Sequence, residues 1–246
     1  MRSREHSEPN MPTYTVEDKV FEVFPDYRRA VVIARDVNNT GEDPETGAML
    51  VEAASRVGPF PTEAENARIA VWNEAYRTFG ADPDKFSPGI RFLYTQIRRS
   101  KPPRPISRLV DIMNAISIGW MAPCGGDDLD SMGGGDIVLG LAQGDETFAP
   151  LFKPAAVESP VAGEVIYYTA PSKRVMCRRW TWRNADFSKI APETRAVAIN
   201  IDMMMPPFRS EDLQAATMEM EALLQQFCGA RTESFVLSPD APAFRF

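Results

Sequence analysis

Residues 109–142 read LVDIMNAISIGWMAPCGGDDLDSMGGGDIVLGLA and pass from a helical pattern into a glycine- and aspartate-rich segment and then an apolar run. The apolar positions at the start recur at helical spacing, which predicts a helix from about Ser107 to Ile118. The run over 137–142 is short and apolar, as expected for a buried strand. A helix, a turn-rich segment and a strand therefore form the centre of the chain.

Helical patterns lie mainly before residue 120, and strand patterns lie mainly after it. The predicted helices span about 62–79, 90–97 and 107–118, and Ser210 begins a last one that Gly229 ends. The predicted strands span about 19–24, 27–37, 137–142, 163–168, 175–182 and 196–203. A polar loop is expected over 38–47. This segregation predicts an α+β fold rather than a doubly wound sheet.

Length and composition fit one large domain. The chain has 246 residues, of which 44% are hydrophobic, and no apolar run approaches the roughly 18 residues of a membrane span. Residues 1–12 are expected to form a flexible tail and 13–246 a single domain. The three cysteines are odd in number and widely spaced, which favours reduced thiols and a cytoplasmic location over disulfides or a zinc site.

Charge and histidine content exclude several classes of function. The net charge of −7 argues against a protein that coats nucleic acid, so binding of RNA would need a local basic patch. The single histidine, His6, lies in the expected tail, which argues against Ser–His–Asp and Cys–His chemistry. Catalysis would have to use carboxylates, backbone amides, arginines or hydroxyl groups of the substrate.

Residues 177–183, CRRWTWR, offer the most distinctive basic patch. In a strand, Arg178, Trp180 and Trp182 would share one face, and Arg179 would lie on the other. Tryptophan can stack on bases and arginine can bind phosphate. The alternative is that the tryptophans belong to the core and the arginines pair with acidic residues.

The aspartate- and glycine-rich segment allows a metal site but does not require one. Asp127, Asp128, Asp130 and Asp136 could bind Mg²⁺ or Ca²⁺, although their spacing matches no EF-hand and favours a turn with capping aspartates. Residues 133–135 lack the order of a nucleotide-binding loop and are expected to form a turn. We therefore expect neither a metal nor another cofactor.

Two other positions carry polar groups of interest. Asn114 lies three residues after Asp111 on the predicted helix, so the two share a face that could either position a ligand or hold the glycine-rich loop. Glu146 follows a predicted strand, where it could act as an acid or base or simply occupy a surface turn.

The order of these segments resembles the B3/B4 domain of the β-subunit of phenylalanyl-tRNA synthetase and its single-domain relatives, over about residues 20–205. The resemblance rests on the run from Leu109-Val110-Asp111 through Asn114, Pro123, Asp128-Leu129-Asp130 and Gly134 to Ala142, and on 177–183. It implies a three-layer β/β/α domain with a pocket for an aminoacyl-adenosine end, and it assigns binding positions to Asn114 and Asp128. This chain departs from the synthetase in having Gly125 or its neighbour at a histidine position, and Asn200 close to a glutamate position.

We therefore expect a tRNA-binding protein that acts in trans as an aminoacyl-tRNA deacylase, with backbone amides of the glycine-rich segment stabilising the oxyanion. The alternatives are a non-catalytic binder of RNA or a small ligand on the same fold, and a metal-dependent hydrolase. No membrane or DNA partner is expected, and no catalytic residue is assigned. The expected binding residues are Asn114, Gly125, Gly126, Asp128, Glu146, Arg178, Arg179, Trp180 and Trp182.

Overall fold

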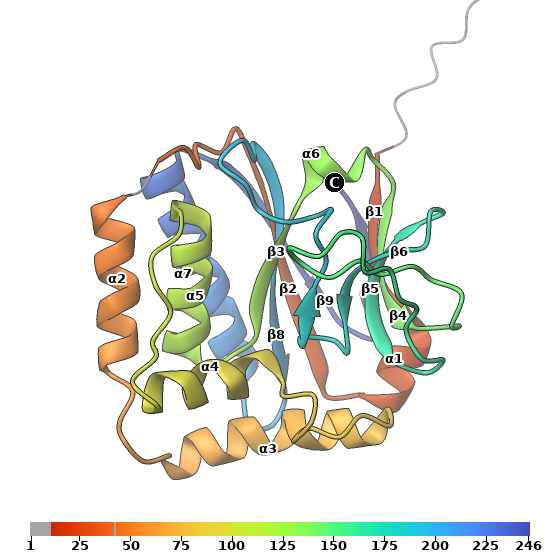
Figure 1. The fold of residues 1–246 in the computed structure, drawn as a ribbon, viewed down its shortest axis with the longest axis horizontal. Coiled ribbons are helices and arrows are strands. Elements are labelled where there is room, and N and C mark those ends of the chain that lie inside the picture. Colours follow the sequence, from red (N-terminus) through yellow and green to blue (C-terminus); the bar gives the residue numbers. More distant parts are fainter. Residues whose placement is uncertain (1–10, 42) are drawn as a thin grey trace, which may run out of the picture.

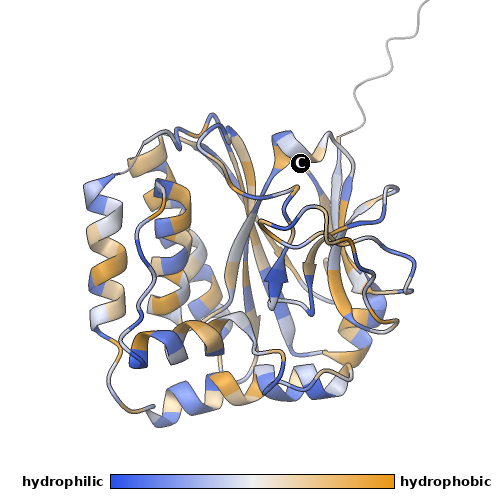
Figure 2. Cartoon of the chain, in the orientation of Figure 1, coloured by the Kyte–Doolittle hydropathy of each residue, from blue (hydrophilic) through white to orange (hydrophobic). Residues whose placement is uncertain are grey.

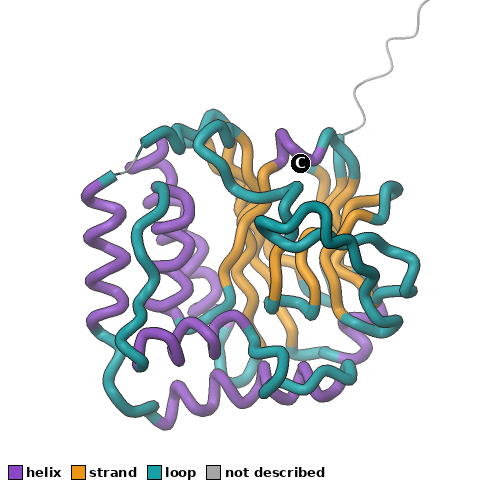
Figure 3. Tube along the Cα trace, in the orientation of Figure 1, coloured by secondary structure: helices purple, strands orange, loops and turns teal. Residues whose placement is uncertain are grey.

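Two β-sheets stack face to face, and helices cover the outer face of one of them (Figures 1 and 3). The computed structural model describes residues 11–41 and 43–246, so residues 1–10 of the expected tail lie outside the described residues. The helices are α1 (Asp18–Val23), α2 (Pro44–Ser55), α3 (Glu63–Thr78), α4 (Gly89–Arg98), α5 (Arg108–Trp120), α6 (Leu129–Met132) and α7 (Ser210–Cys228). None of those described is long and apolar enough to cross a membrane.

The inner sheet is antiparallel and holds the longest strands. Its order is β3 (Cys124–Asp128), β8 (Ala196–Met204), β2 (Tyr27–Arg35) and β9 (Arg231–Leu237). All nine residues of β8 are buried, and β2 is nearly as enclosed, because the second sheet covers one face and helices cover the other. Strand β3 lies at one edge, and β8 is its one partner among the described strands.

The second sheet is mixed, and a small apolar cluster that includes Phe148, Ile166 and Val175 covers part of its outer face. Its order is β10 (Ala243–Arg245), β1 (Thr13–Val16), β4 (Asp136–Leu141), β5 (Val165–Ala170), β6 (Arg174–Arg178) and β7 (Arg183–Asn184). Strands β1 and β4 run parallel, and the other pairs run antiparallel.

Two large apolar clusters stabilise the three layers. One lies mainly between the sheets and extends beneath them to α3 and α4, with Trp72 and Trp180 fully buried in it. The other packs α5 and α7 against the inner sheet. The helices α2 and α3 alternate hydrophobic and hydrophilic positions along their length, as expected for helices with one exposed face (Figure 2). The structure therefore confirms the predicted α+β class and the β/β/α layering.

Most predicted elements are confirmed, and two are wrong. Residues 18–23 form helix α1 rather than a strand. The strand predicted over 175–182 ends at Arg178, because Arg179 and Trp180 adopt left-handed backbone angles, with φ of 45° and 62°. Helix α2 begins within the loop expected over 38–47. The sequence patterns did not predict α2, α6, β1, β3, β7, β9 or β10.

Candidate functional site

A cavity of about 300 Å³ opens beside edge strand β3. It draws residues from α5, which covers one face of the inner sheet, and from β5 and β6, which cover the other face. A single cavity with walls on both sides of the sheet must lie around the sheet's edge, so β3 forms its centre. The lining residues are Gly89, Ile90, Phe92, Leu93, Asn114, Ser117, Pro123, Cys124, Gly125, Gly126, Asp127, Tyr167, Cys177, Trp180, Thr181, Asn184 and Asn200.

The free edge of β3 presents backbone amides to this cavity. In an antiparallel pair, alternate residues direct their N–H groups toward and away from the partner strand. The N–H of Asp128 donates to the carbonyl oxygen of Ser188, on the side away from β8. The same alternation turns the N–H groups of Cys124 and Gly126 away from β8, and no described residue accepts a hydrogen bond from them. Two adjacent donors are therefore available to a ligand.

Three carboxamide side chains line the cavity without hydrogen-bonding to any described residue. They belong to Asn114 on α5, Asn184 on β7 and Asn200 on β8. Asn200 is only 6% exposed, so most of this residue is enclosed by the protein. Polar side chains held at the wall of a cavity in this way are typical of sites that orient a ligand.

Gly125 lies directly opposite Asn200 across the β3–β8 pair and leaves room in the cavity. A Cβ atom at Gly125 would meet nothing within 4 Å, whereas one at Gly126 would lie 2.8 Å from the sulfur of Met113. The two glycines thus serve different purposes: Gly126 lets α5 approach the sheet, and Gly125 keeps the ligand space open.

Asp127 supplies the carboxylate of the cavity. The hydroxyl of Ser188 donates to its Oδ1 atom at 2.7 Å, and Asp127 is otherwise free of hydrogen bonds from described residues. Burial raises the pKa of Asp127 from 3.8 to about 6, an effect that Ser188 and Arg29 oppose and that Asp128 reinforces. A carboxyl group with a pKa near 6 can exchange protons at neutral pH, which suits an acid–base role.

A buried charged cluster behind the cavity joins the two sheets. Arg29 on β2 contacts both carboxylate oxygens of Asp202 on β8, at 2.7 and 2.8 Å. Tyr27 and Tyr167 donate hydroxyl hydrogen bonds to the same carboxylate at 2.7 and 2.9 Å, and Arg29 also donates to the hydroxyl of Tyr14. Tyr167 lines the cavity, so the hydrogen bond from its hydroxyl to Asp202 holds this part of the cavity wall in place.

Of the nine predicted binding residues, four line the cavity and five do not. Asn114, Gly125, Gly126 and Trp180 do line the cavity. Asp128 is buried beside it but accepts hydrogen bonds from the Ser131 backbone and the Thr194 hydroxyl.

Glu146 lies away from the cavity. It is buried and accepts from the backbone amides of Gln143 and Gly144, so it stabilises a tight turn.

The basic and aromatic segment 177–183 is largely turned inward. Arg178 is 4% exposed and contacts Glu164 through two nitrogens, at 2.9 and 2.5 Å. Arg179 packs over the rings of Phe86 and Trp182.

Trp180 is the central ring of an aromatic cluster. It is fully buried and makes edge-on contacts with Phe24, Tyr27 and Trp72. The tryptophan at 180 thus follows the alternative interpretation, in which it belongs to the core.

The four aspartates of the possible metal site are used separately. Asp127 faces the cavity, Asp130 accepts from the amides of Arg195 and Ala196, and Asp136 accepts from the amide of Thr13. Within residues 11–41 and 43–246, no group of three or more His, Cys, Asp or Glu side chains is placed to hold a metal ion.

Sequence reasoning missed Asn184, Tyr167, Cys177 and the first turn of α4 as parts of the site. The first turn of α4 reaches it because the Gly89 amide donates to the Thr181 hydroxyl at 3.2 Å. In a strand, residues 125 and 127 point to the same face, so Asp127 would be expected to lie beside Gly125. This inference requires residues 124–128 to be a strand, as they are in the structure.

One protein family matches this chain. A family model described as the B3/4 domain matches residues 71–229, a range that contains every lining residue of the cavity. Among solved structures, an N-terminal fragment of the phenylalanyl-tRNA synthetase β-subunit from Pyrococcus horikoshii is similar, with 13% identity and a TM-score of 0.46. The match covers 94% of this chain and 53% of that fragment, so this chain spans about half of its length. No curated protein matched the chain.

Proposed function

This chain belongs to the B3/4 domain family, and we propose that it binds the aminoacylated 3′ end of a tRNA in the β3 cavity and hydrolyses the ester of a mischarged amino acid. The observation that carries the proposal is that one carboxylate, Asp127, and free backbone amides at the edge of β3 line the same cavity. All residues that line this cavity lie within the range matched by the family model. The resemblance to the synthetase editing module supplies the substrate class.

In the proposed reaction, Asp127 takes a proton from water as the water oxygen attacks the ester carbonyl carbon. The carbonyl oxygen becomes an oxyanion, and the amides of Cys124 and Gly126 stabilise it. The bond from the carbonyl carbon to the ribose oxygen then breaks, and the protonated Asp127 returns the proton to that oxygen. The products are a free amino acid and a tRNA with a restored terminal hydroxyl.

The carboxamides are suited to holding this substrate. A primary amide offers two donors and one acceptor, so Asn114, Asn184 and Asn200 can bind hydroxyl, amine or carbonyl groups without adding charge. The cavity walls from α4 are apolar, with Ile90 and Leu93 facing the same space. Such walls fit an apolar or aromatic amino-acid side chain.

The test is release of amino acid from a panel of mischarged tRNAs, measured for the wild-type protein and for Asp127→Asn. We expect the wild-type protein to accelerate hydrolysis of at least one ester, and the variant to lose a factor of about 10² to 10⁴. Gly125→Leu serves as a second variant that fills the cavity and leaves the carboxylate in place.

The outcomes separate the two functions considered for this fold. If wild-type protein hydrolyses no member of the panel, the hydrolase is refuted. If it then still binds RNA, and Gly125→Leu weakens that binding, a non-catalytic binding protein accounts for the cavity.

A further inference from the structure

Residues 85–110 form the longest stretch of this acidic chain without Asp or Glu, and positive charge gathers there as it does over residues 173–183. Residues 85–110 contain seven Lys and Arg and no Asp or Glu, whereas the whole chain has 27 basic and 34 acidic residues. The stretch comprises the approach to α4, α4 itself, and the connection that runs past α5 to its first residue (Figure 1). Residues 85–110 therefore offer a local basic patch of the kind that RNA binding needs, whereas Arg178 of the patch expected at residues 177–183 is buried and paired with Glu164.

Three of the seven cations are neutralised within the protein. Arg91 pairs with Asp84, Arg98 with Glu65 and Arg108 with Asp43, at 2.5, 2.9 and 3.1 Å. The remaining four are exposed and form no ion pair with a described residue; they are Lys85, Arg99, Lys101 and Arg104. Solvated, unpaired cations can bind phosphate without first breaking an internal pair.

Helix α4 connects this charge to the cavity. Phe92 lines the cavity mouth and is 55% exposed. Arg99, which caps the end of α4, follows seven residues later, so the two lie on the same face of the helix about 10 Å apart along its axis. An exposed ring beside the cavity is thus followed in line by an exposed guanidinium group.

The connection after α4 presents the next two cations in an extended form. In the sequence Lys101-Pro102-Pro103-Arg104-Pro105, every residue is a proline or precedes one, which disfavours helix and favours polyproline II geometry. The structure has neither helix nor strand there. With three residues per turn, Lys101 and Arg104 lie on one side of such a segment, about 9 Å apart.

We propose that Phe92, Arg99, Lys101 and Arg104, the α4 basic surface, bind the single-stranded RNA that precedes the nucleotide held in the cavity. Phe92 stacks on the base nearest the cavity, and the three cations contact successive backbone phosphates. This inference rests on the proposed function, since it takes the cavity as the site of the terminal nucleotide. It also gives a reason for RNA binding by a chain of net charge −7.

The test measures the binding of tRNA that carries no amino acid (uncharged tRNA) by fluorescence anisotropy over a salt series. It compares the wild-type protein with Lys101→Ala/Arg104→Ala. The variant is expected to bind about tenfold more weakly at low salt. Its plot of log affinity against log salt should be shallower by about 1.4, because each lost phosphate contact on a single strand contributes about 0.7. Phe92→Ala should weaken binding without changing the slope, and Phe92→Tyr should restore it.

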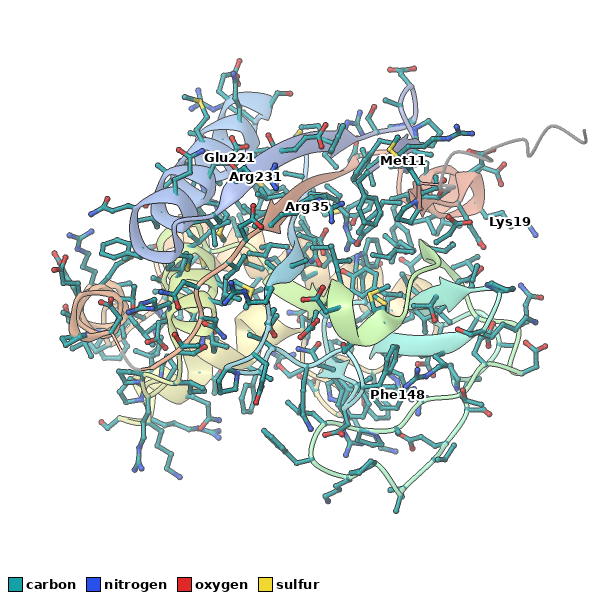
Figure 4. The ribbon with its side chains drawn as sticks, turned by 90° about the horizontal axis from the view of Figure 1, so that it is seen from above. Met11, Lys19, Arg35, Phe148, Glu221 and Arg231 are labelled. Carbon is teal, nitrogen blue, oxygen red and sulfur yellow. The ribbon has the colours of Figure 1, made fainter. Side chains whose placement is uncertain are left out.

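Lys19→Ala/Arg35→Ala is the matched control. It removes the same charge from exposed residues on α1 and β2, elements that do not line the cavity (Figure 4). Its affinity and salt slope should stay within twofold of wild type.

Equal binding by the α4 variant and by this control would overturn the proposal, and so would an absence of tRNA binding by the wild-type protein. Because uncharged tRNA is used, a failure of ester hydrolysis alone would refute the proposed catalysis and leave this surface standing. Circular dichroism of Lys101→Glu/Arg104→Glu, which should bind more weakly still, distinguishes lost contacts from lost folding.

Discussion

Replacement of Asp127 by asparagine should make the protein more stable at neutral pH while removing hydrolysis. The cavity raises the pKa of Asp127 from 3.8 to about 6, so ionising this carboxyl costs more in the folded state than in the unfolded chain. One pKa unit corresponds to about 1.4 kcal/mol, which sets an upper limit of about 3 kcal/mol. Since the side chain is partly exposed, we expect a gain of about 1 to 3 kcal/mol.

The direction in which the free energy of unfolding changes with pH depends on which state, folded or unfolded, holds the proton. Between pH 4 and pH 6, the folded protein keeps the proton on Asp127 and the unfolded chain has lost it, so the free energy of unfolding falls as pH rises through this window. Above pH 6 both states are ionised and this group adds no further slope. Asparagine cannot ionise, and its amide oxygen can still accept the hydrogen bond from Ser188.

Urea denaturation at pH 4 and pH 7.5 measures the effect. Wild type and Asp127→Asn should have similar stability at pH 4, and the variant should be more stable at pH 7.5. Asp145→Asn is a control of opposite sign, because Lys173 lowers the pKa of Asp145 and the exposed pair is lost on substitution. The reasoning would be refuted if Asp127→Asn were no more stable than wild type at pH 7.5.

Three further substitutions test the site and its support. Gly125→Leu should keep near-wild-type stability in thermal unfolding yet abolish ligand binding, because its side chain enters open space in the cavity; binding that survives would place the ligand elsewhere. Asp202→Asn should lower the free energy of unfolding by about 3 to 5 kcal/mol in urea titrations, since it leaves the fully buried Arg29 without a counter-charge. Glu164→Gln should also be destabilising, by removing the main partner of Arg178, and a change below about 1 kcal/mol would show that Glu158 suffices.

Helical periodicity and apolar runs were enough to predict α3, α5, α7 and the strands β2 and β8, because local pattern and burial agree there. Strand β3 could not be predicted in this way. Its sequence, Cys-Gly-Gly-Asp-Asp, has no strand propensity, and it is extended because the edge of β8 offers it hydrogen-bonding partners. The most important strand of the site is therefore fixed by tertiary pairing.

The composition of the site was predictable only in part for the same reason. Asn114 and Gly125 stood out as polar and glycine positions, but Asn184 and Asn200 join them from strands far along the chain. Nothing in the spacing of these residues indicates that one edge strand brings them together. The acidic partners of Arg178 were likewise visible in the sequence, yet the turn that buries the arginine was not.

That turn gives residues 177–183 a structural part in the site. Trp180 packs against Trp72 of α3. The hydroxyl of Thr181 forms hydrogen bonds with the hydroxyl of Tyr76 on α3 and with the backbone amide of Gly89 at the start of α4. The segment thus fixes the helix that carries the cavity rim and the α4 basic surface. An Arg178→Ala/Arg179→Ala variant is consequently expected to lose RNA binding together with stability, through displacement of α4 rather than through lost phosphate contacts. Binding that weakens with an unchanged melting temperature would instead assign these arginines direct contact with RNA.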